Sequence, residues 1–175
     1  MNCIILLGYM CAGKTTVGRV LAKDLGMMFY DLDWYIEERY HTKIGKIFAE
    51  QGEEKFRDLE RRMLHEVAEF QNVVLSLGGG TPCFFDNMEY MNSVAETFYL
   101  KASPDILVKH IGMSRGHRPL LDGKSPEELD TFVRQQLSER EPFYSKAKHI
   151  VGIDLLDSFD RIQDIANIVR SRLDI

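Results

Sequence analysis

Short apolar runs alternate along this chain with longer segments in which apolar residues recur every three or four positions. Cys3–Leu7 is a continuous apolar run, as expected for a strand that is buried on both faces of a sheet. Lys14–Leu25, which follows a glycine-containing break, has the spacing of an amphipathic helix. Strands that alternate with helices in this way predict a parallel sheet covered by helices on both faces.

The same alternation continues along the rest of the chain. Strands are expected at 3–7, 27–30, 73–77, 95–100 and 150–153. Helices are expected at 14–25, 33–40, 44–70, 104–111, 126–140 and 158–173. The helix start after Ser125 is the clearest, because Ser125 fits an N-cap, Pro126 the first turn and Glu128 a capping box. We therefore expect one α/β domain over residues 1–175, with a five-stranded parallel sheet flanked by helices.

Composition and charge narrow the functional classes. A chain of 175 residues can bury a core without a disulfide or metal, and Cys3, Cys11 and Cys83 fit reduced thiols better than a zinc site. No apolar run reaches the roughly 18 residues of a membrane span, and the apolar start is too short for a signal peptide. The net charge of −5 argues against nucleic acid as a partner. We expect a cytoplasmic protein that binds neither membranes nor nucleic acids.

Residues 8–15, Gly-Tyr-Met-Cys-Ala-Gly-Lys-Thr, match the P-loop pattern and lie between an expected strand and an expected helix. In such a loop the backbone N–H groups and the helix N-terminus attract phosphates. Lys14 can reach the β- and γ-phosphates, and the Thr15 hydroxyl can ligate Mg²⁺. The competing interpretation is a glycine-rich turn with an exposed lysine. The motif predicts a nucleoside triphosphate ligand but not the fate of the phosphate.

Polar residues follow two further strands. Asp31 and Asp33 leave the second strand pointing the same way. Asp31 fits a carboxylate that holds Mg²⁺ through water, and Asp33 fits a group that orients an acceptor hydroxyl, although Asp33 also fits a plain helix cap. Ser76, at the end of the third strand, can hold a metal-bound water. The glycines at 78–80 leave room for close approach of a ligand, with a plain turn as the alternative.

Three arginines stand beside expected loops or breaks, at Arg57, Arg118 and Arg140. Arginine makes planar, bidentate contacts with carboxylates and phosphates, although each of these residues taken singly fits a solvated surface. Arg118 lies in a segment, 112–123, that is rich in Gly, Arg and Lys and is expected to be a mobile loop. Closure of such a loop over a transferring phosphate would exclude water and add positive charge.

Taken in order, these segments resemble the shikimate kinases, a family of small P-loop kinases of aromatic amino-acid biosynthesis. The resemblance spans about residues 1–150, and the whole series is far more specific than the P-loop alone. The matching segments are 8–15, Asp31-Leu32-Asp33, Ile47-Phe48, Gly52-Glu53, Phe56-Arg57-Asp58-Leu59-Glu60, 76–80, Arg118-Pro119-Leu120-Leu121, and Arg140 with Pro142, Tyr144 and Ala147. It implies a three-layer fold like that of the nucleoside-monophosphate kinases, with a substrate-binding region at about 32–70 and a mobile lid at about 112–124.

The resemblance also implies an activity and a set of roles. The activity is transfer of the γ-phosphate of ATP to the 3-hydroxyl of shikimate by a Mg²⁺-dependent enzyme, which we expect to be a monomer. The catalytic residues would be Lys14, Asp33 and Arg118. The nucleotide would be bound by Cys11, Ala12, Gly13, Lys14, Thr15, Thr16, His110 and Arg118. Shikimate would be bound by Asp33, Phe48, Phe56, Arg57, Glu60, Gly78, Gly79, Gly80 and Arg140. Thr15 would ligate Mg²⁺ directly, and Asp31 and Ser76 through water.

The chain departs from the family pattern in several places. Cys11 replaces the middle glycine of the P-loop, and His110 stands where the family has an arginine on the adenine side. Thr81-Pro82 is unusual after the glycines, and the late loop at 151–154 lacks the expected arginine and proline. Other open readings are a kinase of another small acid such as gluconate, a nucleotide kinase, a P-loop switch and an inactive binding module. A guanine switch is disfavoured because no Asn-Lys-x-Asp base reader is present.

Overall fold

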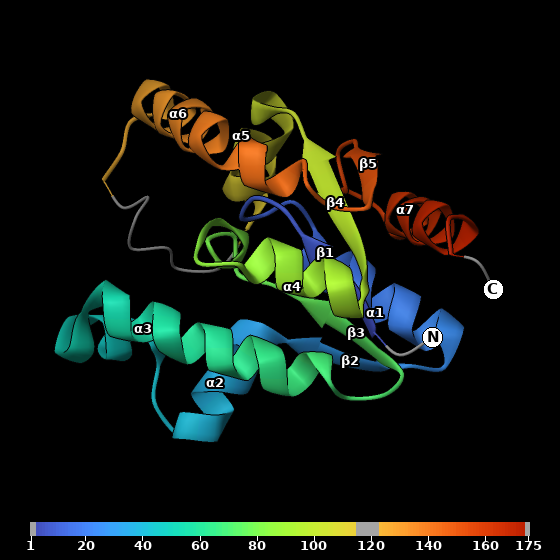
Figure 1. Cartoon of the computed structure of the whole chain (residues 1–175). Helices are drawn as coiled ribbons and strands as arrows, with labels where there is room; N and C mark the ends of the chain where they lie inside the picture. The colour runs from blue at the N-terminus through green and yellow to red at the C-terminus, as the bar shows by residue number, and fades with distance from the viewer. Residues whose placement is uncertain (1–2, 115–122, 174–175) are drawn as a thin grey trace.

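A parallel β-sheet forms the centre of the structure, a computed structural model that describes residues 3–114 and 123–173 (Figure 1). Its five strands are β1 (Cys3–Leu7), β2 (Met28–Asp31), β3 (Val73–Ser76), β4 (Glu96–Ala102) and β5 (His149–Ile153). They lie in the order β2-β3-β1-β4-β5, and each neighbouring pair is parallel. The predicted fold class, a five-stranded parallel sheet flanked by helices, is confirmed.

Helices cover both faces of this sheet. They are α1 (Lys14–Leu25), α2 (Leu32–Tyr40), α3 (Ile44–Ala68), α4 (Asn87–Val94), α5 (Pro104–Met113), α6 (Pro126–Tyr144) and α7 (Phe159–Ser171), with a short 3₁₀ turn, η1, at Thr81–Cys83. In Figure 1, α1 and α7 lie on one side of the sheet, and α3 and α4 lie on the other. None of the helices that the structure describes is long and apolar enough to cross a bilayer.

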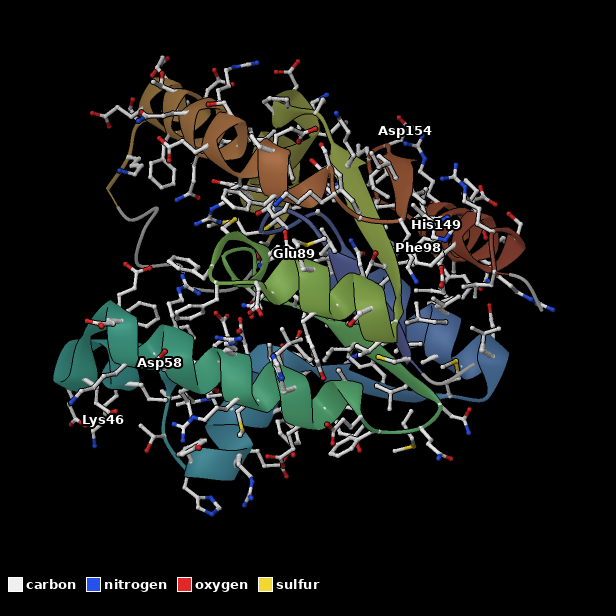
Figure 2. All side chains as sticks on the ribbon, viewed as in Figure 1. Lys46, Asp58, Glu89, Phe98, His149 and Asp154 are labelled. Atoms are coloured by element: carbon white, nitrogen blue, oxygen red, sulfur yellow. The ribbon has the colours of Figure 1, made fainter. Side chains whose placement is uncertain are left out.

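The continuous apolar runs form strands that are buried on both faces, as expected from the sequence. Every residue of β1 and β3 is buried, because these inner strands have helices on both faces. The edge strands β2 and β5 are less buried and have a mixed composition. Phe98 of β4 stacks on His149 of β5 with 4.4 Å between ring centroids, which ties that edge strand to the sheet (Figure 2).

Three elements differ from the prediction. The segment between β3 and β4 contains η1 and α4, which the sequence pattern did not predict because both are short. Helix α6 continues through Pro142 to Tyr144, beyond the expected end at Arg140, since a proline in the last turn removes few helical hydrogen bonds. The arginines were expected beside loops or breaks. Arg57 follows the break that Gly52 makes in α3, where φ is 80° and ψ is 170°, but Arg140 lies within α6, where the expectation is wrong.

The register of the sheet brings the candidate site together. Ser76 at the end of β3 pairs with Leu6 of β1 on one side and with Asp31 of β2 on the other. Parallel strands place their carboxyl ends along the same edge, where loops form ligand sites in open α/β sheets. The P-loop, Asp31 and the glycines after β3 all leave the sheet at this edge.

Candidate active site

The P-loop between β1 and α1 is shaped by glycines at both ends. Gly8 and Gly13 have φ values of 142° and 87°. An added Cβ on Gly8 would lie 2.7 Å from the carbonyl oxygen of Leu100, and one on Gly13 would clash with the side chain of Leu156. Cys11 also has a positive φ, of 60°, at the position of the missing middle glycine. Because Gly13 is the N-cap of α1 and has no side chain, the first N–H groups of the helix face the loop without a side-chain cap. Such an end binds phosphate.

Lys14 lies under this loop with only 8% of its surface exposed. Its Nζ donates hydrogen bonds to the carbonyl oxygens of Gly8 at 2.9 Å and Tyr9 at 2.7 Å. Ala12 is fully buried, and its N–H donates to the same Tyr9 carbonyl, so Ala12 shapes the turn. The ammonium group is thus held at the inner wall of the phosphate cradle.

Three oxygen-bearing side chains meet where β2 and β3 end. The Thr15 hydroxyl donates to Oδ2 of Asp31 at 2.9 Å, which leaves the lone pairs of the hydroxyl for another ligand. The hydroxyl of Ser76, paired with Asp31 in the sheet, is buried without a hydrogen-bond partner among the described residues. A buried hydroxyl without a partner beside a carboxylate fits a hydrated cation.

These three residues fit Mg²⁺ rather than a metal enclosed by protein ligands. The described part of the chain has no cluster of three or more His, Cys, Asp or Glu side chains that could hold a metal. Mg²⁺ usually keeps several waters and combines one or two protein oxygens with phosphates. Thr15, Asp31 and Ser76 offer such a partial set next to the phosphate cradle.

Asp31, not Asp33, caps helix α2. Oδ1 of Asp31 accepts hydrogen bonds from the N–H groups of Asp33 at 3.1 Å and Trp34 at 3.4 Å. The alternative interpretation of Asp33 as a plain cap is therefore wrong. Its carboxylate lies in the first turn of α2 and faces Gly78.

The Asp33 carboxyl is partly desolvated and surrounded by other charges. Burial, followed by the neighbouring carboxylates of Asp31 and Glu60, raises the pKa of Asp33 from 3.8 to about 7, while Lys14 and Arg57 act in the opposite direction. A carboxyl group whose pKa lies near neutrality is suited to accept a proton from a hydroxyl.

The three glycines after β3 each face a different functional side chain. A Cβ on Gly78 would lie 3.0 Å from Oδ1 of Asp33, and one on Gly79 would lie 3.2 Å from Nη1 of Arg140. On Gly80 it would lie 2.6 Å from Nη2 of Arg57. Glycine is needed here for close approach, since none of the three has a positive φ. The turn therefore brings one carboxylate and two guanidinium groups against a single stretch of backbone.

Arg57 has two kinds of carboxylate partner. Nη1 donates to Glu60 at 2.8 Å, and the Glu60 side chain is 2% exposed. Nε and Nη2 share one oxygen of Glu53 at 3.3 and 3.2 Å, but the Glu53 side chain is 58% exposed. The ring centroids of Phe48 and Phe56 lie 5.8 and 5.2 Å from the guanidinium carbon. One edge of the guanidinium thus has a buried partner, and the other has a solvent-exposed partner.

Arg140 approaches the same turn from α6. Its guanidinium carbon lies 5.7 Å from the ring centroid of Tyr9 in the P-loop. One turn further along α6, the Tyr144 hydroxyl donates to the carbonyl of Gly79 at 2.6 Å, which fixes the helix to the glycines. Burial raises the pKa of Cys83, and the charges of Arg140 and Arg57 both act against this shift, as expected if both cations lie near that thiol. Two of the three arginines that the sequence singled out, Arg57 and Arg140, therefore converge on the glycine turn.

A cavity of about 550 Å³ extends from the P-loop to the glycine turn. Its polar wall is formed by Cys11, Gly13, Lys14, Thr15, Thr16, Asp31, Asp33, Ser76, Gly78 and Gly79. Its apolar wall includes Met113 at the end of α5, Leu156 after β5 and Ile162 of α7. The cavity has the lining expected for a nucleotide site, with a phosphate cradle and a group of apolar side chains.

His110 lies on the wall of this cavity, but its ring nitrogens bind the backbone. Nδ1 lies 2.9 Å from the carbonyl oxygen of Cys11, and Nε2 accepts from the N–H of Leu156 at 2.9 Å. Nδ1 must therefore carry the proton. His110 joins the P-loop to the loop before α7, and its nitrogens are already committed to these bonds.

We expect His110→Phe to destabilise the protein. The ring would remain, but the Cys11 carbonyl and the Leu156 amide would lose this partner, at an expected loss of about 1–3 kcal/mol. Urea unfolding of both proteins measures the effect. His110→Asn, which restores a donor near the position of Nδ1, should recover part of the loss. Equal stability of wild type and His110→Phe would contradict this role.

Sequence reasoning missed several residues of this site, and one residue that it named lies outside the described part of the chain. It gave no role to Tyr9, Tyr144 and Leu156, whose contacts depend on packing between distant segments. It also missed Phe84, whose ring lies 4.1 Å from the Arg57 guanidinium carbon. The only signal nearby was the unusual Thr81-Pro82 pair. Arg118 and most of the expected lid, residues 115–122, lie outside the described residues.

Comparison with known proteins points to one family. A family model described as shikimate kinase matches residues 10–169. The chain is 51% identical over 173 residues to a shikimate kinase of Phocaeicola vulgatus, covering 99% of each chain. A solved shikimate kinase of Bacteroides thetaiotaomicron superposes with a TM-score of 0.96 at 48% identity, again covering 99% of both chains.

Two further solved structures bear on the acceptor. A shikimate kinase of Acinetobacter baumannii in complex with shikimate has a TM-score of 0.84 at 32% identity and covers 98% of this chain and 94% of its own. A gluconokinase of Sinorhizobium meliloti has a TM-score of 0.60 at 15% identity, covering 98% of each chain. At that identity the second likeness concerns the fold alone.

Proposed function

This chain belongs to the shikimate kinase family, and on that premise we propose that it transfers the γ-phosphate of ATP to the 3-hydroxyl of shikimate with the side chains described above. The products are ADP and shikimate 3-phosphate, in the pathway to chorismate and the aromatic amino acids. The observation that carries the assignment of residues is the convergence of Asp33, Arg140 and Arg57 on three successive glycines beside the P-loop cavity.

The nucleotide occupies the P-loop end of the cavity. The first N–H groups of α1 and the Lys14 ammonium face the β- and γ-phosphates, and the base lies toward Met113, Leu156 and Ile162. Thr15 directly, and Asp31 and Ser76 through water, would hold Mg²⁺, which when bound neutralises charge on the phosphates. We further propose that the lid at 112–124 closes over the nucleotide and brings Arg118 to the transferring phosphate.

The acceptor hydroxyl lies at Asp33. A carboxylate there accepts a hydrogen bond from the 3-hydroxyl, orients its oxygen toward the phosphorus atom and takes its proton as the bond forms. The raised pKa of Asp33 supports this role, because it matches the proton affinity of the carboxyl to neutral conditions. Positioning and charge neutralisation supply most of the acceleration in phosphoryl transfer.

The carboxylate of shikimate binds between Arg57 and Arg140. Two guanidinium groups against one stretch of backbone suit a planar anion, because each can donate two parallel hydrogen bonds. Gly78, Gly79 and Gly80 leave space for the ring of the acid. Phe48, Phe56 and Glu60 surround Arg57 on the side of α3. Phe48, Phe56, Arg57 and Glu60 fall within the expected substrate region at 32–70, whereas Arg140 comes from α6.

The function is tested by ADP release with ATP and Mg²⁺, coupled to a spectroscopic readout, for a panel of acceptors. Shikimate should give turnover, and gluconate and nucleoside monophosphates should give none above the background hydrolysis of ATP. Turnover with gluconate and none with shikimate would refute the proposed acceptor. Sedimentation of the same preparation tests the proposed monomer, and fractionation of the source cells tests the proposed cytoplasmic location.

Arg57→Ala should act on shikimate rather than on ATP. Loss of a charge-assisted, bidentate contact is expected to raise the KM for shikimate by about 10- to 100-fold. The KM for ATP should stay within about twofold, since Arg57 is not among the residues lining the nucleotide cavity. Steady-state kinetics with each substrate varied in turn gives both values. An unchanged shikimate KM would refute the role of Arg57.

A further inference from the structure

The turn that follows the three glycines has contacts that the reaction itself does not explain. It consists of η1, Thr81–Cys83, and the next residue, Phe84. Thr81 and Pro82 are buried, and the Thr81 carbonyl accepts a 2.8 Å hydrogen bond from the buried side chain of Asn87 at the start of α4. The turn is therefore fixed to the fold behind the glycines, and it presents two side chains to the surroundings of Arg57.

Thr81 acts on Arg57 through Glu60. The Thr81 hydroxyl donates to Oε1 of Glu60 at 2.6 Å, and Oε2 of the same carboxylate accepts from Nη1 of Arg57 at 2.8 Å. Thr81 is 0% exposed and Glu60 is 1% exposed, so solvent does not compete for these bonds. Each oxygen of Glu60 thus has its own donor, and together the two bonds fix the carboxylate that holds one edge of the guanidinium.

Phe84 acts on Arg57 directly. Its ring centroid lies 4.1 Å from the guanidinium carbon, closer than those of Phe48 and Phe56. Arginine stacks favourably on an aromatic face while its N–H groups remain available at the edges. Backbone at Gly80 lies close to the same group. The guanidinium is confined by the turn without losing the donors of its exposed edge.

We infer that Thr81 and Phe84 are positioning residues for Arg57, and that through it they set the affinity of the enzyme for the carboxylate of its acid substrate. Thr81 fixes the orientation of the buried edge of the guanidinium, and Phe84 fixes its plane. A preorganised guanidinium loses less side-chain freedom when a carboxylate binds. The inference rests on the proposed function, since it takes Arg57 to bind the carboxylate of shikimate.

Phe85 supplies a matched control for Phe84. It is the next residue and is 52% exposed, and its ring centroid lies 5.3 Å from the guanidinium carbon of Arg61 instead of that of Arg57. Phe84→Leu is expected to raise the KM for shikimate by about three- to tenfold, because it removes the stacking face. Phe85→Leu should change the KM for shikimate by less than about twofold. Neither variant should change the KM for ATP by more than about twofold. Steady-state kinetics measures all four values.

Thr81 is tested by removing and restoring its hydroxyl. Thr81→Val is expected to raise the KM for shikimate by about tenfold, because a buried oxygen of Glu60 loses its donor. Thr81→Ser keeps the donor and should return the KM to within about twofold of wild type. A serine variant as impaired as the valine variant would overturn the role of the hydroxyl. Should Thr81→Val fail to fold, the half-buried Phe84 still tests the inference.

A double-mutant cycle separates positioning from a merely structural role. In an Arg57→Ala background, Phe84→Leu should change kcat/KM for shikimate by less than about 1.5-fold, because the group that Phe84 positions is absent. The inference is overturned if Phe84→Leu has the same effect on kcat/KM with and without Arg57. It is also overturned if Phe85→Leu raises the KM for shikimate as much as Phe84→Leu does. Different results would refute the proposed substrate site and the proposed positioning of Arg57. No effect of Arg57→Ala on the shikimate KM refutes the proposed site, whereas a large effect of Arg57→Ala and none of Phe84→Leu refutes only the positioning.

Discussion

Lys14→Met is expected to lower kcat by about a thousandfold or more, because removal of one positive group from a phosphoryl-transfer site has effects of this size. Lys14 is buried at the inner wall of the phosphate cradle, where its ammonium already lies beside the loop that holds the phosphates. Little water surrounds the side chain, so its charge acts on the transferring group with little screening. Single-turnover kinetics at saturating substrates measures the loss in the chemical step.

The same variant should remain folded. The carbonyl oxygens of Gly8 and Tyr9 lose the ammonium donor, and methionine fills most of the lysine volume, so we expect a stability loss of about 1–2 kcal/mol. Circular dichroism and a thermal melt serve as the control. A folded Lys14→Met enzyme with turnover within about tenfold of wild type would show that the charge is not required.

Asp33→Asn should lower kcat by about 10²- to 10⁴-fold, the usual contribution of a positioned general base. The amide keeps the size of the side chain and can still contact a hydroxyl, but it cannot take a proton. The shikimate KM should change much less than kcat. Steady-state kinetics with shikimate varied gives both constants. A kcat close to that of wild type would exclude Asp33 as the base.

The same substitution should stabilise the protein in the absence of metal and nucleotide. Asp33 binds its proton more tightly in the folded chain, where its pKa is about 7, than in the unfolded chain, where it is near 3.8. Wild type therefore loses stability as the pH rises from about 4 to about 7, and the asparagine variant lacks this loss. Above pH 7 the variant should exceed wild type by roughly 2–4 kcal/mol.

Urea unfolding of both proteins in EDTA, at pH 8 and pH 5, tests this linkage. The stability difference at pH 5 should be less than half of that at pH 8, because Asp33 is then largely protonated in the folded wild type. A difference that does not depend on pH would mean that the asparagine acts through packing. The expected pair of results, higher stability with lower turnover, identifies a residue kept for chemistry rather than for the fold.

The sequence predicted correctly the strands, helix starts and loops whose structure depends on neighbouring residues in the chain. Apolar runs such as Cys3–Leu7 have only one common solution in an α/β domain, and the P-loop spacing requires a strand before it and a helix after it. The capping box at Ser125 and Glu128 is present as predicted. Asp31 and Ser76, each predicted at the end of a strand, pair in the sheet.

What could not be predicted depends on contacts between distant segments. Nothing local to Phe84 reveals that Arg57, 27 positions earlier, packs on its ring. His110 has the sequence context of a nucleotide contact, yet its nitrogens are bound by backbone groups of Cys11 and Leu156 that the fold brings to it. Arg140 was expected at the end of a helix, whereas α6 continues past it because the helix tolerates Pro142 in its last turn.

The unequal partners of Arg57 have a consequence for how the enzyme selects its acid. Glu60 is buried and stays in place, but Glu53 is an exposed neighbour one helical turn away, and such pairs contribute only about 0.3–0.5 kcal/mol. Glu53 therefore acts as a tethered internal competitor for the exposed edge of the guanidinium. A free chloride or phosphate ion must displace it for a single contact, whereas an acid that also meets Arg140 and Asp33 gains enough to do so. The Arg57–Glu53 ion pair therefore weakens the binding of simple anions to Arg57 more than it weakens the binding of the acid substrate.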